Sequence, residues 1–375
     1  MIKKSLLYSF IFASLVCCGS HKNDSKIASK QMLIDKLELA AKSGIVFYGQ
    51  QDATLYGHTW FGERGRSDIK DVSGDYPAIL GFDCGGIELG HLTSLDNIRF
   101  DNMRTAIVDH YNRGGIITIS WHLANPVTDG NSWDLRANDP VQSILPNQPH
   151  HKKFIGWLDR LSAFFLSLKT ENGDLIPIIF RPWHEHTGTW FWWGQNHCTT
   201  DEYIALWKFT KSYLDSKGLT NLVYAYSPNL GVNKKMYLER YPGDSIIDLL
   251  GIDIYQFSTK DSTGLITNHN ADLYISETQK ALKFLSEIGA ERSKPIAFTE
   301  TGYEGIPMPN WWTDVLYQAI KGYPISYVLT WRNACDRPEH FYAPFPGQIS
   351  ANDFIDFTNK NNIGLLKRLT ILSEE

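Results

Sequence analysis

Two glutamates in aromatic surroundings are the strongest candidates for chemistry. Glu185 lies in the stretch RPWHEH, and Glu300 lies in the stretch FTETG. One carboxylic acid that protonates a leaving oxygen, paired with one ionised carboxylate, is what cleavage of a glycosidic bond needs. Arg181 and His184 flank the first glutamate, and a neighbouring cation favours an ionised nucleophile, whereas an apolar wall raises the pKa of an acid. The residues therefore predict a glycoside hydrolase.

The sequence His184-Glu185-His186 also raises the question of a metal site. Its spacing differs from His-Glu-x-x-His, which puts two imidazoles on one helical face, and adjacent side chains of an extended segment point to opposite sides. The chain also contains no Gly-rich phosphate loop and no Gly-x-Ser-x-Gly elbow. We therefore expect no metal and no cofactor.

The elements that position these residues are indicated by repeated apolar runs. Each run is nearly continuous and of strand length, as in parallel strands that are buried on both faces. The runs are Ile45 to Tyr48, Ala78 to Phe82, Ile116 to Trp121, Ile176 to Phe180, Leu222 to Ser227, Leu249 to Tyr255, Ile296 to Thr299 and Tyr327 to Trp331. Helical patterns alternate with them: Asn102 to Tyr111, Lys153 to Leu168, Asp201 to Leu214, Leu273 to Leu285 and Trp311 to Ile320. The alternation predicts an α/β fold, a (β/α)8 TIM barrel, with one catalytic domain at residues 31–375.

Polar residues gather where the predicted strands end, which is the catalytic face of such a barrel. They are Asp83, His122, Arg181, Glu185, Asn229, Asp253, Tyr255, Glu300, Trp331 and Arg332. The ends of the fourth and seventh strands face each other across a barrel mouth, so Glu185 and Glu300 are expected to be opposed partners. For the helix that follows Glu185, Asp201 is the expected N-cap and Gly218 the stop.

Four motifs together resemble glycoside hydrolase family 26, chiefly β-mannanases. They are SWHLANP at 120–126, RPWHEHTGTWFWWG at 181–194, GIDIYQ at 251–256 and FTETG at 298–302, within a resemblance that covers roughly residues 31–370. The resemblance implies a retaining enzyme with Glu185 as acid/base and Glu300 as nucleophile. It also implies that other residues line the substrate site: His122, His184, Trp190, Tyr255, Trp331 and Arg332. Arg181 and Trp133 are expected to bind substrate as well, on the chemistry of their side chains.

The aromatic share of 13% includes 12 Trp, and aromatic rings suit a groove that stacks on the apolar faces of sugars. In the run of residues 190–193 we expect Trp190 to face sugar, and at least one of Trp192 and Trp193 to belong to the core. Further stacking candidates are Trp121, Trp133 and Trp331.

By the same resemblance, the expected substrate is β-1,4-linked mannan, glucomannan or galactomannan, cleaved through a covalent glycosyl-enzyme intermediate. Alternatives on the same fold are an exo-acting enzyme that releases mannobiose, a xylanase and a mixed-linkage glucanase. The loop Asn125 to Pro149 is a candidate for blocking one end of the groove. A non-catalytic polysaccharide-binding lipoprotein is disfavoured, because such a protein needs the aromatic rings but not the two glutamates.

The N-terminus has the pattern of an export signal. Lys3 and Lys4 precede the apolar run Leu6 to Val16, which is too short to span a bilayer. The sequence Leu-Val-Cys-Cys-Gly that follows resembles a bacterial lipobox. We expect a signal peptide at 1–17, lipidation of Cys18 and a flexible polar tether at 18–30. The protein is thus expected to be an exported bacterial lipoprotein, anchored on the periplasmic or the cell-surface side.

Composition limits the remaining possibilities. With 375 residues, 43% of them hydrophobic and a formal charge of -5, the chain can bury a large core and has no basic cluster for nucleic acid. Cys84, Cys198 and Cys335 are too few for a disulfide framework, although one bridge is possible. We expect a monomer.

Overall fold

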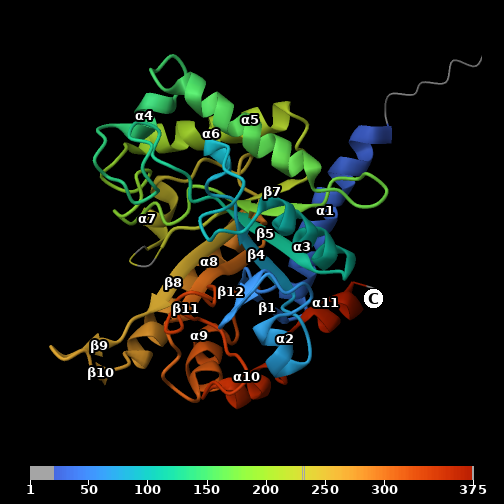
Figure 1. Ribbon diagram of the computed structural model, residues 1–375, viewed down its shortest axis with the longest axis vertical. Coiled ribbons are helices and arrows are strands. Elements are labelled where there is room, and N and C mark those ends of the chain that lie inside the picture. Colours follow the sequence, from blue (N-terminus) through green and yellow to red (C-terminus); the bar gives the residue numbers. More distant parts are fainter. Residues whose placement is uncertain (1–20, 230, 232, 374–375) are drawn as a thin grey trace, which may run out of the picture.

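A closed barrel of eight parallel strands forms the centre of the molecule in the computed structural model, which describes residues 21–229, 231 and 233–373 (Figure 1). In order around the barrel the strands are β1 (Val46–Gln51), β4 (Ile79–Asp83), β5 (Ile116–Ser120), β6 (Ile178–Arg181), β7 (Leu222–Tyr226), β8 (Leu249–Gln256), β11 (Ile296–Tyr303) and β12 (Ile325–Thr330). Pairing of β12 with β1 closes the ring. Each of the eight predicted runs overlaps one of these strands, so the (β/α)8 prediction is confirmed.

Helices follow the strands and surround the barrel (Figure 1). They are α1 (His21–Lys42), α2 (Asp68–Ser73), the 3-10 turn η1 (Ile87–Leu89), α3 (Phe100–Asn112), α4 (Pro140–Ile144), α5 (His151–Ser167), α6 (Thr200–Ser216), α7 (Lys234–Glu239), α8 (Ala271–Arg292), the π-helical η2 (Trp312–Leu316), α9 (Tyr317–Ile320), α10 (Ala351–Thr358) and α11 (Leu366–Leu372). Two small hairpins decorate the catalytic face, β2 (Tyr56–Gly57) with β3 (Trp60–Phe61), and β9 (Thr259–Lys260) with β10 (Ile266–Asn268). The short β13 (Ile363–Gly364) pairs with β1.

The start of α6 differs from the sequence prediction. The N-cap is Thr199, whose hydroxyl accepts from the backbone N–H of Glu202, while the Glu202 carboxylate accepts from the N–H of Thr199. This reciprocal pair satisfies two backbone donors at once, which Asp201 inside the first turn cannot do. The prediction of Asp201 as N-cap is therefore wrong. Gly218 follows the helix with φ 87° and marks its end as predicted.

Helix α1 closes the N-terminal end of the barrel. Its residues Leu33, Leu37 and Ala40 are buried in one apolar cluster with barrel residues such as Ile179 and Val223. The helix begins at His21, so residues 21–30 are helical, where the sequence predicted a flexible tether. Cys18 and the predicted signal peptide lie outside the described residues. Within the part that the structure describes, no helix has the length and apolarity needed to cross a bilayer.

Candidate active site

Arg181 and Glu300 form the centre of the site. Arg181 ends β6 and is buried, and its guanidinium donates to Glu300 Oε2 and to Asp253 Oδ2, the latter at 2.7 Å. The other oxygen of Glu300 accepts from the Tyr255 hydroxyl at 2.7 Å. Both oxygens of this carboxylate are therefore bound by donors from β6 and β8, and such charge-assisted bonds fix its orientation.

A register shift helps to aim Glu300 into the mouth. The pairing of β11 with β8 is irregular between Phe298 and Glu300. Such a bulge inserts a residue into one strand and redirects the side chains that follow. Thr299, just before it, donates its hydroxyl to Asp253 Oδ1 at 2.7 Å. Thr299 and Glu300, which are successive residues of β11, thus both belong to the polar cluster around Arg181 and Asp253.

Glu185 is placed where its protonated form is favoured. Burial raises its pKa well above the ordinary range, and the negative charges of Glu300 and Asp253 raise it further, against the opposing charge of Arg181. Its Oε2 accepts from Trp190 Nε1 at 2.9 Å. The charge of Glu300 thus acts on Glu185, while the two carboxyl groups have different hydrogen-bond partners.

The backbone that carries Glu185 is in an unusual conformation. Trp183 and Glu185 have φ values of 55° and 53°, which non-glycine residues rarely adopt. The carbonyl of Trp183 accepts from the Tyr203 hydroxyl at 2.6 Å, and the carbonyl of His184 accepts from Trp193 Nε1 at 2.9 Å. Conformations of this kind persist only where surrounding contacts enforce them, and they concentrate at functional sites.

Asp83, His122 and His184 form a buried chain beside the glutamates. His122 Nδ1 lies 2.7 Å from Asp83 Oδ2, and the Nε2 atoms of His122 and His184 are 3.1 Å apart. Burial alone would lower the pKa of His122, but the charge and hydrogen bond of Asp83 raise it above the ordinary value. Burial and the charges of Arg181 and His122 hold the pKa of His184 well below its ordinary value. The surroundings thus favour the charged form of His122 and the neutral form of His184.

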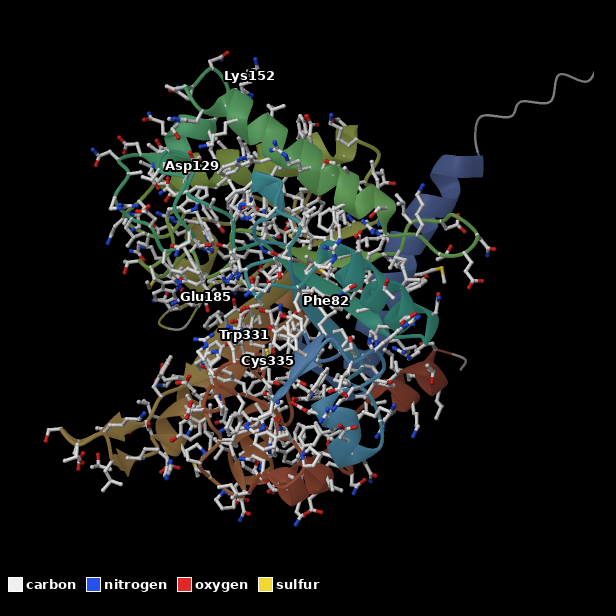
Figure 2. All side chains as sticks on the ribbon, viewed as in Figure 1. Phe82, Asp129, Lys152, Glu185, Trp331 and Cys335 are labelled. Atoms are coloured by element: carbon white, nitrogen blue, oxygen red, sulfur yellow. The ribbon has the colours of Figure 1, made fainter. Side chains whose placement is uncertain are left out.

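A cavity of about 600 Å³ opens next to this chain. Its wall includes Asp83, His122, Trp133, Trp331 and Arg332, which come from the loops after β4, β5 and β12. Figure 2 shows Glu185 and Trp331 in the central part of the molecule, whereas Asp129, in a loop, and Lys152, at the start of α5, lie at its periphery. The cavity gives a sugar chain room on the side of the barrel mouth formed by β4, β5 and β12.

Two residues, Asp96 and Tyr56, hold Arg332 against the cavity wall. Arg332 Nη1 lies 2.8 Å from Asp96 Oδ1, and the Tyr56 hydroxyl donates to Asp96 at 3.0 Å and to Asp52 at 2.9 Å. Burial raises the pKa of Asp52 well above the ordinary range, and the charge of Asp96 adds to that effect. The guanidinium thus lies over a network of acids rather than free in solvent.

The comparisons with known proteins agree with this arrangement. A family model described as Glycosyl hydrolase family 26 matches residues 23–331. The chain belongs to glycosyl hydrolase family 26. A mannan endo-1,4-beta-mannosidase of Bifidobacterium adolescentis is 31% identical over 89% of the chain, although the chain spans only 34% of that relative. A second enzyme of that name, from Bacillus subtilis, is 28% identical over 74% of the chain and 72% of its own length.

A solved structure of this family is also similar. The GH26 beta-mannanase from Bacteroides ovatus is 45% identical, with a TM-score of 0.86 over 91% of this chain and 96% of that one. The similarity extends over the whole barrel and is not confined to the catalytic motifs.

The aromatic residues that were candidates for stacking on sugar fall into two groups in the structure, exposed rings and buried rings. Trp190 is 39% exposed and Trp133 is 50% exposed, so both rings are accessible. Trp192 and Trp193 are fully buried, which confirms that this run is partly core. Trp121 is also fully buried and donates to Glu88. The prediction of Trp121 as a stacking residue is wrong, because its ring is buried in the core against Trp183.

Two buried carboxylates were given no role from the sequence: Asp253, which was only placed at a strand end, and Glu88. Asp253 binds Arg181, Thr299 and Ser227, and burial, with the charge of Glu300, raises its pKa to about 7 against the opposing charge of Arg181. Glu88 accepts from Trp121 and from the backbone N–H of Ala124. The motif around residues 251–256 was a signal for Asp253, but Glu88 has no such motif.

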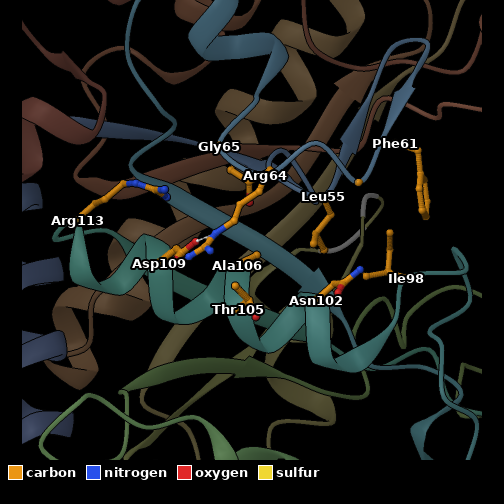
Figure 3. Close-up of a pocket in the computed structure, with 12 residues that line it drawn as sticks. Leu55, Phe61, Arg64, Gly65, Ile98, Asn102, Thr105, Ala106, Asp109 and Arg113 are labelled. Carbon is orange, nitrogen blue, oxygen red and sulfur yellow. Dashed lines mark hydrogen bonds and ion pairs between the residues drawn. The ribbon is translucent and has the colours of Figure 1, made fainter.

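A smaller cavity of about 140 Å³ lies outside the barrel mouth, between the β2–β3 hairpin and α3 (Figure 3). Arg64 spans it and donates two bonds of 2.9 Å to Asp109. Phe61 borders this cavity and also the large one. Phe61 is the residue that the two cavity linings share, and neither Glu185 nor Glu300 lines the small cavity.

The His, Cys, Asp and Glu residues of the described part of the chain can be compared with the arrangement of known metal sites. Across residues 21–229, 231 and 233–373, no group of three or more His, Cys, Asp or Glu residues has the arrangement of a metal site. Cys84, Cys198 and Cys335 are free thiols in the structure.

Proposed function

We propose that this protein hydrolyses β-1,4-mannosidic bonds of mannan, glucomannan or galactomannan with retention of configuration. The observation that carries the proposal is the difference between its two glutamates. Burial favours the protonated form of Glu185, whereas Arg181 and Tyr255 donate to both oxygens of Glu300. One carboxyl group is thus equipped to give a proton and the other to attack.

In the first step, a Glu300 oxygen attacks the anomeric carbon while the bond from that carbon to the glycosidic oxygen breaks. Glu185 transfers its proton to the departing oxygen, and a covalent glycosyl-enzyme ester remains. Arg181 and Tyr255 keep the nucleophile oriented before the attack. This orientation lowers the entropic contribution to the activation free energy. The remaining sugar units stay bound along the groove.

In the second step, Glu185 is a carboxylate and accepts a proton from water. The water oxygen attacks the anomeric carbon, and the bond to Glu300 breaks. The anomeric centre is inverted twice, so the product has the configuration of the substrate. Each glutamate returns to its starting protonation state.

The substrate assignment rests on the relatives and on the site. The proteins of Bifidobacterium adolescentis and Bacillus subtilis carry the name mannan endo-1,4-beta-mannosidase. The wide cavity and the accessible rings of Trp133 and Trp190 suit a chain of pyranoses. Internal cleavage is our proposal for the mode of attack. A time course on mannan that yields a spread of oligomers supports it, and release of mannobiose alone contradicts it.

The glutamates are tested by separate substitutions. Glu185→Gln and Glu300→Gln should each abolish turnover of mannan while mannohexaose still binds, because glutamine keeps the shape but loses the proton or the charge. Glu291→Gln is the control, since Glu291 is exposed on α8 and forms an ion pair with Lys234. Undiminished turnover by either active-site variant would overturn the mechanism.

We also propose that the protein is an exported, monomeric bacterial lipoprotein anchored through acylated Cys18. The support is the apolar run that precedes Leu15-Val16-Cys17-Cys18-Gly19. Cys18→Ala should move the protein from the membrane fraction to the soluble fraction of the expressing bacterium. Cys17→Ala is the matched control and should stay with the membrane. A Cys18→Ala protein that remains membrane-bound contradicts the anchor.

A further inference from the structure

An exposed aromatic ring stands beside the nucleophile and belongs to none of the residue sets above. Phe257 is the first residue after β8, and 73% of its surface is exposed. Its ring centroid lies 6.4 Å from that of Tyr255, whose hydroxyl binds Glu300. The ring of Phe257 is therefore a neighbour of the tyrosine that orients the nucleophile.

The backbone around this ring is held firmly. The carbonyl of Phe257 accepts from Asn270 Nδ2 at 2.8 Å, which ties the two ends of the β9–β10 segment together. Gln256 donates to the carbonyl of His269 at 2.7 Å and accepts from Trp311 Nε1 at 2.7 Å. The segment leaves the barrel body, as Figure 1 shows, but its base is fixed.

A further bond connects this base to the strand of the nucleophile. His269 Nδ1 lies 2.7 Å from the hydroxyl of Tyr303, and Tyr303 ends β11, the strand that carries Glu300. The position of the Phe257 backbone is therefore defined relative to Glu300. An apolar ring that is presented on a fixed backbone, next to a reacting group, is suited to stacking on a ligand.

The side of the site on which Phe257 lies indicates which part of the substrate it meets. The large cavity is lined by residues that follow β1, β4, β5 and β12, and neither Glu185 nor Phe257 borders it. Glu185, Trp190 and Phe257 follow β6 and β8, across the mouth. Because the acid must reach the leaving oxygen, the leaving part of the sugar chain extends toward β6 and β8.

We propose that Phe257, fixed by the base of the β9–β10 segment, is a stacking platform for a sugar of the leaving-group chain beyond the one that receives the proton. The proposal rests on the proposed function and extends it. The ligand is a neutral β-linked pyranose that offers an apolar ring face. The platform favours binding registers that place two or more sugars on the leaving side.

The test compares Phe257→Ala with Leu265→Ala on mannohexaose whose reducing end carries a heavy-oxygen label. Leu265 is a matched control because it is 67% exposed and apolar, at the far end of the same segment. Phe257→Ala should lower kcat/KM about five- to tenfold and shift cleavage toward the reducing end. Leu265→Ala should keep the wild-type bond distribution, and Phe257→Trp should restore it.

An aryl mannobioside provides a second readout, since its leaving group is too short to reach the platform. The loss of kcat/KM caused by Phe257→Ala should be smaller on this substrate than on mannohexaose. A wild-type bond distribution in Phe257→Ala overturns the platform alone. Absence of cleavage of mannohexaose by the wild-type protein overturns the proposed function and the platform with it.

Discussion

The two ends of the barrel are both buried, but they are filled in opposite ways. At the N-terminal end, Leu37 and Ala40 of α1 pack with Ile179 and Val223 in a purely apolar cluster. At the C-terminal end, the side chains of Arg181, Glu300 and Asp253 are buried to a similar degree, but they are charged or titratable. Strand β6 contributes to both ends, since Ile179 and Arg181 are only two residues apart.

The difference teaches that one strand supplies stability at one end and chemistry at the other. An apolar side chain in the core contributes through burial alone. A buried charge is costly to desolvate and depends on its partners, so the polar end is stable only while Arg181, Asp253 and Glu300 remain together. In a barrel of this type, catalytic groups come from strand C-termini and stability from the opposite face.

The largest expected effect comes from removing the buried cation Arg181, which stabilises the polar end of the barrel. Arg181→Met leaves Asp253 and Glu300 without their counter-charge, so the free energy of unfolding should fall by about 3–5 kcal/mol. The turnover of mannan should fall to background, because Glu300 loses a donor. Denaturant unfolding and kcat measure the two effects. A stable variant with activity within tenfold of wild type would contradict the account.

The pH dependence of kcat/KM tests the protonation of Glu185 at the polar, C-terminal end of the barrel. The pKa of Glu185 is held well above its ordinary value by burial, with the charges of Glu300 and Asp253 adding to it. The first step needs the protonated form, so kcat/KM should fall as the pH rises through that pKa. Glu185→Ala should lose this alkaline limb on an activated aryl mannoside, and should lower kcat on mannan about 10³-fold. If the fall of kcat/KM at high pH persists in the variant, a group other than Glu185 causes it, and the assignment is contradicted.

The apolar end should affect stability without affecting chemistry. Leu37→Ala should lower the free energy of unfolding by about 2–5 kcal/mol, because a buried cavity replaces the side chain. At a temperature where the variant is folded, kcat on mannan should equal that of the wild type. Met32→Ala, on the exposed side of α1, is the control and should change neither quantity. A change in kcat would show that the two ends are coupled.

The smallest expected effect concerns the histidine chain. Asp83→Asn removes the charge that raises the pKa of His122, so that pKa should move down. Loss of one charge-assisted hydrogen bond should lower kcat/KM about tenfold. Nuclear magnetic resonance titration of the His122 ring measures the first effect. An unshifted titration would mean that Asp83 does not determine the charge of His122.

The sequence predicted the strands and the two glutamates because both have local signals. Strands that are buried on both faces read as continuous apolar runs, and Glu185 and Glu300 follow two of those runs in distinctive motifs. These features depend on a few neighbouring residues, so they can be recognised along the chain.

Other features depend on contacts between distant residues. The φ values of Trp183 and Glu185 are maintained by tertiary hydrogen bonds, and the register shift before Glu300 arises from pairing with β8. Burial of Trp121 depends on Glu88, which is 33 residues away. No local pattern encodes these contacts, which is why Trp121 was expected to stack on sugar.

The central claim is that Glu185 gives the proton and Glu300 forms the covalent intermediate. The most direct test is proton nuclear magnetic resonance of the first product released from mannohexaose, recorded before the anomers interconvert. The account predicts that the new reducing end appears first as the β-anomer. Initial appearance of the α-anomer would mean a single displacement by water and would contradict the account.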